Sequence, residues 1–301
     1  MAKLVFGCGY LGSRVVERWI AAGEKVHVVT RRPERAAELA AIGCLPIVGD
    51  ITIPGSMPAF PPVDTLLFAV GFDRRSGQSI HTVYVDGLRT VLQLLEAASA
   101  PLPRRVIYIS STGVYGTAGG DWVDETTECH PQRDGGRACL DAERLLHADP
   151  WRDRTLILRC AGIYGPGRIP HRQQLLDGLP LAVPSHGFLN LIHVDDAAVV
   201  TANLGLSNDF PATEPPVGPP SPLVLNLSDG HPVVRSEYYA EVARLLGAPP
   251  PRFVEPSGDS PATLRAGADK RVSNERAVRL LRPTWLYPSY REGLAAILAA
   301  R

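Results

Sequence analysis

Short apolar runs alternate with amphipathic segments through the first half of the chain. The runs are rich in Val, Ile and Leu, and they occupy residues 4–6, 25–30, 45–49, 65–70, 105–110 and 155–159. Continuous apolar runs of this length are typical of strands buried on both faces of a parallel sheet. The segments between them have helical periodicity and lie at 13–23, 34–43, 83–98 and 136–147. Strand and helix in alternation predict a doubly wound α/β sheet.

The pattern changes beyond residue 160. Prolines and loops become frequent there, and helical periodicity returns at 236–247 and 274–281. We therefore expect a smaller, separate lobe in the C-terminal half. The segment 207–222, SNDFPATEPPVGPPSP, is too rich in proline for a helix or a strand, and it predicts an exposed loop.

Composition and charge narrow the range of ligands. The 301 residues include 31 basic and 31 acidic side chains and no Lys/Arg-rich run, which argues against nucleic acid and against an anionic membrane surface. A small molecule is the better expectation. The N-terminal residues match neither a signal peptide nor a membrane span. The five cysteines form no C-x-x-C pair, which argues against a disulfide framework and a zinc site and fits a reducing cytoplasm; they are Cys8, Cys44, Cys129, Cys139 and Cys160.

The first chemical motif is GCGYLG, in which Gly7, Gly9 and Gly12 form G-x-G-x-x-G between a strand and a helix. The first glycine permits a tight turn, the second lets the backbone approach a pyrophosphate, and the third permits close packing of the helix. The phosphate then lies at the helix N-terminus. The motif opens a complete βαβ unit, so it predicts a dinucleotide site.

The end of the second strand indicates which dinucleotide. A carboxylate about 20 residues past the glycines would bind the ribose 2′-hydroxyl of NAD, but this chain has VVTRRPER there. The guanidinium groups of Arg31 and Arg32 suit the 2′-phosphate of NADP, so we expect NADP, with NAD still open. The alternative is that both are solvated surface arginines. Asp50, after the third strand, is either an adenine contact or a turn residue.

Four further motifs carry a resemblance to a known family. They are ISSTGVYG (109–116), AGIYGPGR (161–168), NLIHVDDAA (190–198) and NLSDG (226–230). With them, nearly the whole chain resembles the extended short-chain dehydrogenase/reductases, the NAD-dependent epimerase/dehydratase group, in an atypical branch. The resemblance implies a Rossmann domain over 1–166, completed by roughly 187–235, and a substrate-binding lobe over 167–186 and 236–301. It adds expected cofactor contacts at Tyr10, Leu11, Ile51, Ala69, Val70, Gly71 and Cys160.

The stretch GGRACLDAE departs from this family. Relatives commonly read Y-x-x-x-K-x-x-A-E, and the shared Ala142-Glu143 places Gly135 at the tyrosine and Cys139 at the lysine. In the family that tyrosine is the general acid/base, and the lysine lowers its pKa. Neither function is available from glycine or from a neutral thiol. We expect Cys139 to be a small buried residue rather than a reactive thiol.

Other positions of the implied catalytic site are mixed. The strand-end serine of the family matches Ser111, whereas Thr112 and Gly113 stand where the sugar-nucleotide dehydratases carry an acid and a base. Dehydration by that route is not expected. Tyr84 and Tyr115 are candidates for the missing acid, with ordinary aromatic packing as the alternative for both.

Two polar stretches have competing interpretations. Asp73, Arg74 and Arg75 either clamp an anionic substrate or form a solvated turn. In LIHVDD, an aspartate N-cap and a structural histidine explain His193, Asp195 and Asp196 better than a metal site does, so we predict no metal.

Two classes of function remain open from the sequence. The first is an NADP-dependent oxidoreductase or epimerase-like enzyme that acts on a small carbonyl or hydroxyl substrate through Ser111 and either a relocated tyrosine or a bound water. The second is a non-catalytic NADP(H)-binding sensor or scaffold. By resemblance, we also expect a homodimer through helices 83–98 and 136–147.

Overall fold

The computed structural model describes residues 1–116, 119–207, 222–255 and 269–299. The chain forms two compact units, and its segments are shared between them in alternation. The first unit comprises Met1–Ser111, Asp134–Arg159 and Ala198–Leu225, and the second comprises Thr112–Arg133, Cys160–Ala197 and Asn226–Arg301. The sequence-based division into a cofactor-binding domain and a substrate-binding lobe has other boundaries. Which unit binds which ligand stays a prediction. Residues 208–221 of the predicted proline-rich loop lie outside the described residues.

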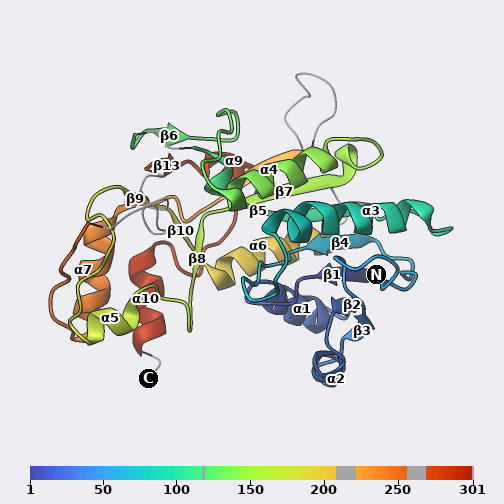
Figure 1. The fold of residues 1–301 in the computed structure, drawn as a ribbon, viewed down its shortest axis with the longest axis horizontal. Helices are drawn as coiled ribbons and strands as arrows, with labels where there is room; N and C mark the ends of the chain where they lie inside the picture. The colour runs from blue at the N-terminus through green and yellow to red at the C-terminus, as the bar shows by residue number, and fades with distance from the viewer. Residues whose placement is uncertain (117–118, 208–221, 256–268, 300–301) are drawn as a thin grey trace. The chain divides into compact units, whose positions relative to one another are not determined.

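A seven-stranded sheet forms the centre of the first unit (Figure 1). Its strand order is β11-β7-β5-β4-β1-β2-β3, and the neighbours of β1, β2 and β4 within it pair in parallel. The six strands predicted from the sequence are confirmed, and β11 is an addition. Their bounds are β1 Ala2–Phe6, β2 Lys25–Thr30, β3 Leu45–Val48, β4 Thr65–Phe68, β5 Arg105–Ser111, β7 Thr155–Cys160 and β11 Leu223–Leu227.

Helices cover both faces of this sheet. In Figure 1, α3 and α4 lie together on one face, and α1 and α2 lie on the other. The amphipathic α1 buries Val15, Val16 and Trp19, and the Trp19 indole N–H donates to the Ala202 carbonyl of α6 at 3.0 Å. The predicted helices are confirmed, with bounds α1 Gly12–Ala21, α2 Pro33–Ala41, α3 Gly87–Ala97 and α4 Asp134–Leu146; α6 spans Val194–Leu206.

The helix predicted at 83–98 differs from a regular α-helix at its start. It begins with a π-helical turn, η1 (Thr82–Asp86), in which the Gly87 N–H reaches back to the Thr82 carbonyl, and α3 follows. Hydrophobic periodicity does not reveal one additional residue in a turn. Turns of this kind frequently occur at functional sites.

The second unit contains short strand pairs and helices. The pairs are β8 (Gly162–Tyr164) with β10 (Leu191–His193), β9 (Phe188–Leu189) with β12 (Val233–Val234), and β6 (Trp122–Val123) with β13 (Arg271–Val272). The helices are α5 Arg172–Leu176, α7 Arg235–Leu246, α9 Glu275–Leu281 and α10 Tyr290–Ala299. Apolar and aromatic side chains from α7, α10 and these strands form a separate core, including Tyr164, Leu181, Tyr238, Val242 and Leu294.

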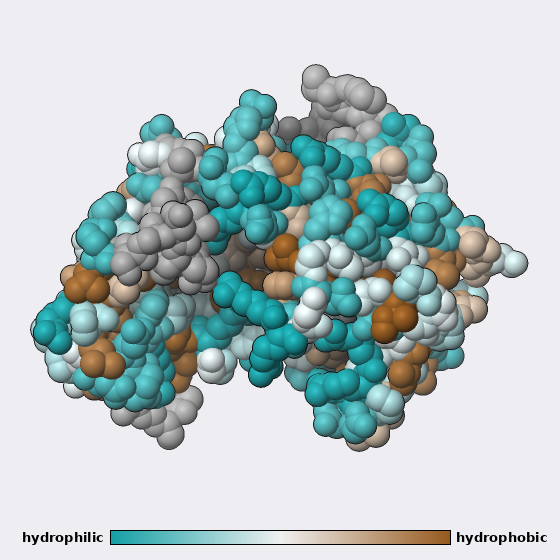
Figure 2. All heavy atoms as spheres, viewed as in Figure 1, coloured by the Kyte–Doolittle hydropathy of each residue, from teal (hydrophilic) through white to brown (hydrophobic). Residues whose placement is uncertain are grey.

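Most of the face seen in Figure 2 is hydrophilic, with apolar side chains in small groups. Within the described parts of the chain, none of the helices has the length and apolar character needed to cross a membrane.

A buried carboxylate lies in the second unit. Asp229, the second residue after β11, is 5% exposed, and its Oδ1 accepts the His231 N–H at 2.9 Å. Its Oδ2 is buried with no hydrogen-bond partner. Burial raises the pKa of Asp229 to about 7, with a smaller contribution from the Asp196 charge; the His231 charge and the N–H groups of His231 and Tyr290 act in the opposite direction.

The raised pKa of Asp229 predicts a pH-dependent stability. The folded state holds the proton of the Asp229 carboxyl more tightly than the unfolded chain does. The stabilisation of the folded state by this proton is therefore fully present below about pH 4 and is lost as the pH rises to about 7. Asp229→Asn keeps the group neutral. Its free energy of unfolding should therefore rise relative to wild type between pH 4 and 8, by on the order of 3 kcal/mol. Chemical denaturation at several pH values measures this difference.

Asp121→Asn, at an exposed aspartate of the same unit, is the matched control and should show no such trend. A difference between Asp229→Asn and wild type that is constant from pH 4 to 8 would contradict the raised pKa.

Candidate functional site

The glycine-rich turn joins β1 to α1 at the point where the strand order reverses. Gly7 has φ 93°, and a Cβ atom there would overlap the Ala69 carbonyl at the end of β4. A Cβ atom at Gly12 would overlap the Gly7 carbonyl. Gly9 is different, because a Cβ atom there would have no neighbour within 4 Å. The first and third glycines therefore permit the close packing, and the second leaves open space beside its backbone, as a bound pyrophosphate requires.

The start of α1 favours an anion. The helix has 10 residues, no side chain caps its N-terminus, and its first turn contains no acidic residue. The Arg14 guanidinium covers the Tyr10 ring at 4.7 Å and donates to the Tyr10 carbonyl at 2.8 Å, which holds the turn in place. Leu11 is buried under the turn. The helix N-terminus thus has the partial positive charge that phosphate groups bind.

The predicted 2′-phosphate arginines lie at the end of β2. Arg31 and Arg32 are both exposed and directly precede α2. Asp73, in the loop after β4, is close enough to Arg31 to interact with it electrostatically. Asp73 also accepts the Arg75 N–H at 2.9 Å and pairs with the exposed Arg75 side chain, so this loop has the features of the solvated turn named as one alternative.

Asp50 and Ile51 follow β3. The Asp50 Oδ1 accepts hydrogen bonds from the N–H and the hydroxyl of Thr52 at 2.8 and 2.7 Å. These bonds make Asp50 part of a local turn. Ile51 packs closely against Gly87, at the start of α3. Val70 and Gly71 follow β4, with Val70 partly buried and Gly71 exposed. These positions follow the carboxyl ends of two strands of the same sheet, the edge at which ligands bind in doubly wound folds.

The helix α4 carries Gly135 and Cys139, the two residues that the sequence register aligns with the family's tyrosine and lysine. A Cβ atom at Gly135 would touch only the end of the Ile80 side chain, at 3.5 Å. Cys139 is 5% exposed. Burial is the main cause that raises the pKa of its thiol to about 12, and it has hydrogen-bond contacts with Tyr108 and Ser110. Cys139 is therefore a neutral, buried thiol, as expected from the sequence.

A buried ion pair fixes α4 against the sheet. The Arg159 Nη2 donates to the Glu143 Oε2 at 2.7 Å and its Nε donates to Oε1 at 3.1 Å. The side chains are 7% and 1% exposed, and the Ser110 hydroxyl donates to the same carboxylate at 2.5 Å. The sequence showed Glu143 only as a register marker. The hydrophobic run at 155–159 gives no sign that its arginine, Arg159, is buried.

Tyr84 lies in the π-helical turn η1, which packs against α4. Its side chain is partly buried, and it is close enough to Tyr108 to affect that residue electrostatically. Tyr108 in turn contacts Cys139. Tyr84 and Cys139 are therefore both neighbours of Tyr108. Ser111, partly buried, ends β5 one residue after Ser110 in this region.

Tyr115 lies in the second unit. It is 2% exposed, and its hydroxyl donates to the Asn226 Oδ1 at 2.8 Å. Lys270, also buried, donates from its ammonium group to the carbonyls of Tyr115 and Gly116 at 3.3 and 3.4 Å. These contacts favour aromatic packing for Tyr115, the alternative named above. Cys160 is buried at the end of β7.

The LIHVDD segment has a structural explanation that differs in part from the predicted one. His193 is 1% exposed, its Nδ1 accepts the Asp195 N–H at 3.2 Å, and its ring lies 3.9 Å from that of Tyr287. The carboxylate of Asp196 accepts the N–H groups of Leu286 and Tyr287, 90 and 91 residues away. Asp196 thus anchors a distant loop instead of capping α6, whose first turn already includes it.

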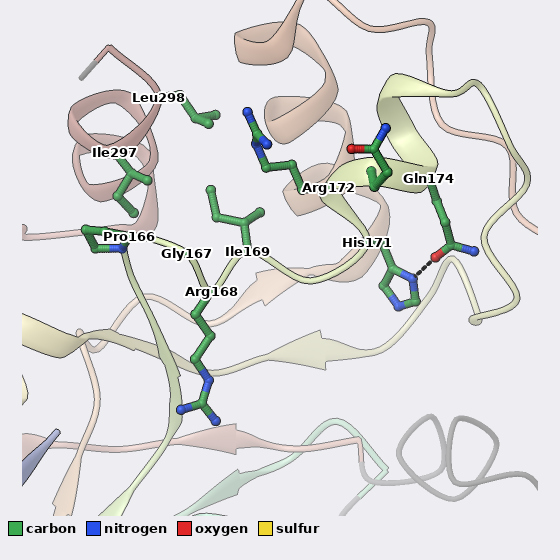
Figure 3. Close-up of a pocket in the computed structure, with 10 residues that line it drawn as sticks. Pro166, Gly167, Arg168, Ile169, His171, Arg172, Gln174, Ile297 and Leu298 are labelled. Carbon is green, nitrogen blue, oxygen red and sulfur yellow. Dashed lines mark hydrogen bonds between the residues drawn. The ribbon is translucent and has the colours of Figure 1, made fainter. Parts of the chain in front are cut away.

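A cavity of about 730 Å³ lies within the second unit (Figure 3). The loop after β8, the start of α5 and the end of α10 form its walls. The lining residues are Pro166, Gly167, Arg168, Ile169, His171, Arg172, Gln173, Gln174, Ile297 and Leu298. The sequence did not single out any residue of α5 or α10, because a cavity depends on side chains that are far apart in the chain.

Comparison with known proteins extends these observations. Residues 4–200 match the model of the NAD dependent epimerase/dehydratase family. The Escherichia coli K12 protein YeeZ is 33% identical over 203 residues, covering 67% of this chain and 65% of YeeZ. The chain thus matches slightly less than two thirds of that relative's length. A 3-diazoavenalumate denitrifying reductase of Streptomyces is 29% identical over 221 residues, 67% of each chain.

A solved structure supports the fold over the full length. The human epimerase family protein SDR39U1 with NADPH matches 100% of both chains with a TM-score of 0.78 at 17% identity. A TM-score of this size over both full lengths shows that the two chains share their overall fold. Together with the glycine turn and the family match over 4–200, this confirms the resemblance predicted from the sequence: the chain belongs to the NAD dependent epimerase/dehydratase family.

Proposed function

We propose that the protein is an NADP(H)-dependent oxidoreductase that reduces a small carbonyl substrate without the family's tyrosine and lysine pair. The observation that carries this proposal is the glycine turn. Gly7 and Gly12 are packed against backbone, while the space beside Gly9 is open at the uncapped N-terminus of α1. A pyrophosphate fits this arrangement. The packing of the turn does not itself require glycine at residue 9, because a Cβ atom there would have no neighbour within 4 Å.

The cofactor residues follow from this placement. The α1 N-terminus and the turn residues Gly9, Tyr10 and Leu11 would hold the pyrophosphate, and Ala69, Val70 and Gly71 would border it from β4. The exposed guanidinium groups of Arg31 and Arg32 would bind the 2′-phosphate in fork-like pairs. Asp50, Ile51 and Cys160 stay proposed contacts of the same site. That SDR39U1 was solved with NADPH supports this choice of cofactor.

The bound nicotinamide would supply the hydride, and the chain's own residues would handle the proton. Ser111 ends β5, and its hydroxyl can polarise a carbonyl or hold a developing oxyanion. Tyr84 is placed by η1 against α4, where Gly135 contributes no side chain. A phenol normally keeps its proton at neutral pH, so Tyr84 would act as the proton donor.

This assignment favours reduction over oxidation. Alcohol oxidation needs a base, and the family forms one by lowering the tyrosine pKa with a nearby lysine. Here Cys139 stands at the lysine position with a thiol that stays neutral. The loss of such a base typically costs about 10²–10⁴-fold in rate. Reduction needs only a donor, which a neutral phenol provides. The name of the Streptomyces reductase agrees with this direction.

The first prediction from the proposed function concerns the cofactor. NADPH should bind more tightly than NADH, and an Arg31→Ala/Arg32→Ala double variant should lose most of this preference, because the 2′-phosphate would lose its charged hydrogen bonds. Calorimetric titration measures both dissociation constants. Arg89→Ala, at an exposed arginine of α3 that pairs with Asp86, is a matched control. Equal affinities in wild type, or an unchanged preference in the double variant, would remove the NADP assignment.

The second prediction concerns the proton path. Ser111→Ala should abolish turnover and leave NADPH affinity nearly unchanged, and Tyr84→Phe should lower kcat by about 10²-fold or more. Cys139→Ala should have little effect on the chemical step. A screen of carbonyl substrates with NADPH, followed by single-turnover kinetics, measures these effects. Robust alcohol oxidation by wild type that is unaffected by Ser111→Ala would show that the site lies elsewhere.

A non-catalytic NADP(H) sensor is the second candidate, favoured by the loss of both family residues at Gly135 and Cys139. Tight NADPH binding with no turnover across the carbonyl screen would support it. We place the protein in the cytoplasm as part of the proposal, where its five free thiols would remain reduced.

We further propose a homodimer through the helices α3 and α4. Both lie on the same face of the sheet in Figure 1, as helices of a shared interface must. Light scattering at micromolar concentration should give twice the chain mass of 32.4 kDa. A monomeric mass at this concentration would refute the dimer.

A further inference from the structure

The cavity of the second unit has walls of unequal chemistry. Ile169, Ile297 and Leu298 form an aliphatic side, and Leu298 is 8% exposed. The ionisable residues of the lining are Arg168, His171 and Arg172, and no carboxylate is among the lining residues. A volume of about 730 Å³ is in the range of small-molecule sites. A carboxylate lies nearby at Asp177, which accepts a hydrogen bond from Gln173, but the lining itself carries basic groups only, and these favour an anion.

One of these basic groups faces the aliphatic side. In Figure 3, the Arg172 side chain extends into the space between Leu298 and Ile169. Arg168 turns away from that space, and the His171 Nδ1 is bonded to the Gln174 Oε1. In the part of the chain that the structure describes, the Arg172 guanidinium has no ion-pair or hydrogen-bond partner. Arg172 is therefore the group that an anion in this cavity would meet.

The backbone before Arg172 supports a fixed position for it. His171 has φ 57°, a left-handed conformation that is uncommon for a residue with a side chain. The contact with Gln174 and an edge-on contact with the Tyr239 ring at 5.6 Å hold His171 in this conformation. The start of α5 is thus anchored to α7, and Arg172 projects from an anchored turn.

We propose that this cavity binds a monocarboxylate with an apolar body. The carboxylate would accept two hydrogen bonds from the Arg172 fork, and the body would displace water from Ile169, Ile297 and Leu298. A sugar is disfavoured on the aliphatic side, because hydroxyls that face Ile169, Ile297 and Leu298 would find no hydrogen-bond partner there. The site lies within the second unit and does not depend on the proposed cofactor or reaction.

The test uses 4-phenylbutyrate as the probe and its neutral amide, 4-phenylbutyramide, as the matched ligand. Titration calorimetry of the full chain without cofactor should show saturable binding of the acid and binding at least about tenfold weaker for the amide, because the amide lacks the charge-assisted pair. Arg172→Gln should weaken binding of the acid by at least about tenfold and leave the amide unchanged. Arg172→Lys should retain part of the affinity, since it keeps the charge without the fork.

Arg244→Gln is the matched control, because Arg244 is an exposed arginine of α7 that pairs with Glu241 and does not line the cavity. It should leave binding of the acid unchanged. Thermal unfolding verifies that each variant is folded. No binding of 4-phenylbutyrate, equal binding of acid and amide, or an equal loss in Arg172→Gln and Arg244→Gln would each overturn the proposal. Failure of the NADPH experiments would leave this result unaffected.

Discussion

The close approach of backbone to backbone at residues 7 and 12 is the constraint on which the first unit depends. Gly7 packs against the Ala69 carbonyl, and Gly12 packs against the Gly7 carbonyl, so α1 begins directly over the ends of β1 and β4. Any side chain at either position would separate the helix from the sheet. The same packing presents the uncapped helix N-terminus and the open space beside Gly9 at the point where the strand order reverses. One local constraint thus sets both the packing of α1 on the sheet and the position of the proposed cofactor site.

The helix α4 is held against the sheet by a buried ion pair. The Glu143 carboxylate, bonded to Arg159 and Ser110, joins α4 to β7 and β5 without any contribution from residues 135 and 139. Removing one partner of such a buried pair typically costs about 3–5 kcal/mol. This pair therefore holds α4 on the sheet without the need for a particular side chain at residue 135. The π-helical turn with Tyr84 packs against α4, the helix that carries Gly135.

The sequence predicts the first unit better than the second, for a physical reason. Its strands are buried runs with a period that is visible in one sequence, and its glycine turn depends on residues only two to five positions apart. The fold family, the six strands and the buried state of Cys139 follow from such local signals. Three features join residues that are distant in sequence, and no local pattern indicates them. They are the anchor from Asp196 to residues 286–287, the Glu143–Arg159 pair and the cavity at Arg172. The extra residue of η1 escapes prediction because hydrophobic periodicity barely changes across it.

The most direct test of the account is an electron-density map of crystals grown with NADPH. The account predicts the pyrophosphate beside Gly9 at the start of α1, the 2′-phosphate between Arg31 and Arg32, and the nicotinamide ring within reach of the Ser111 and Tyr84 hydroxyls. A nicotinamide ring far from both hydroxyls, or a 2′-phosphate that contacts neither arginine, would contradict it.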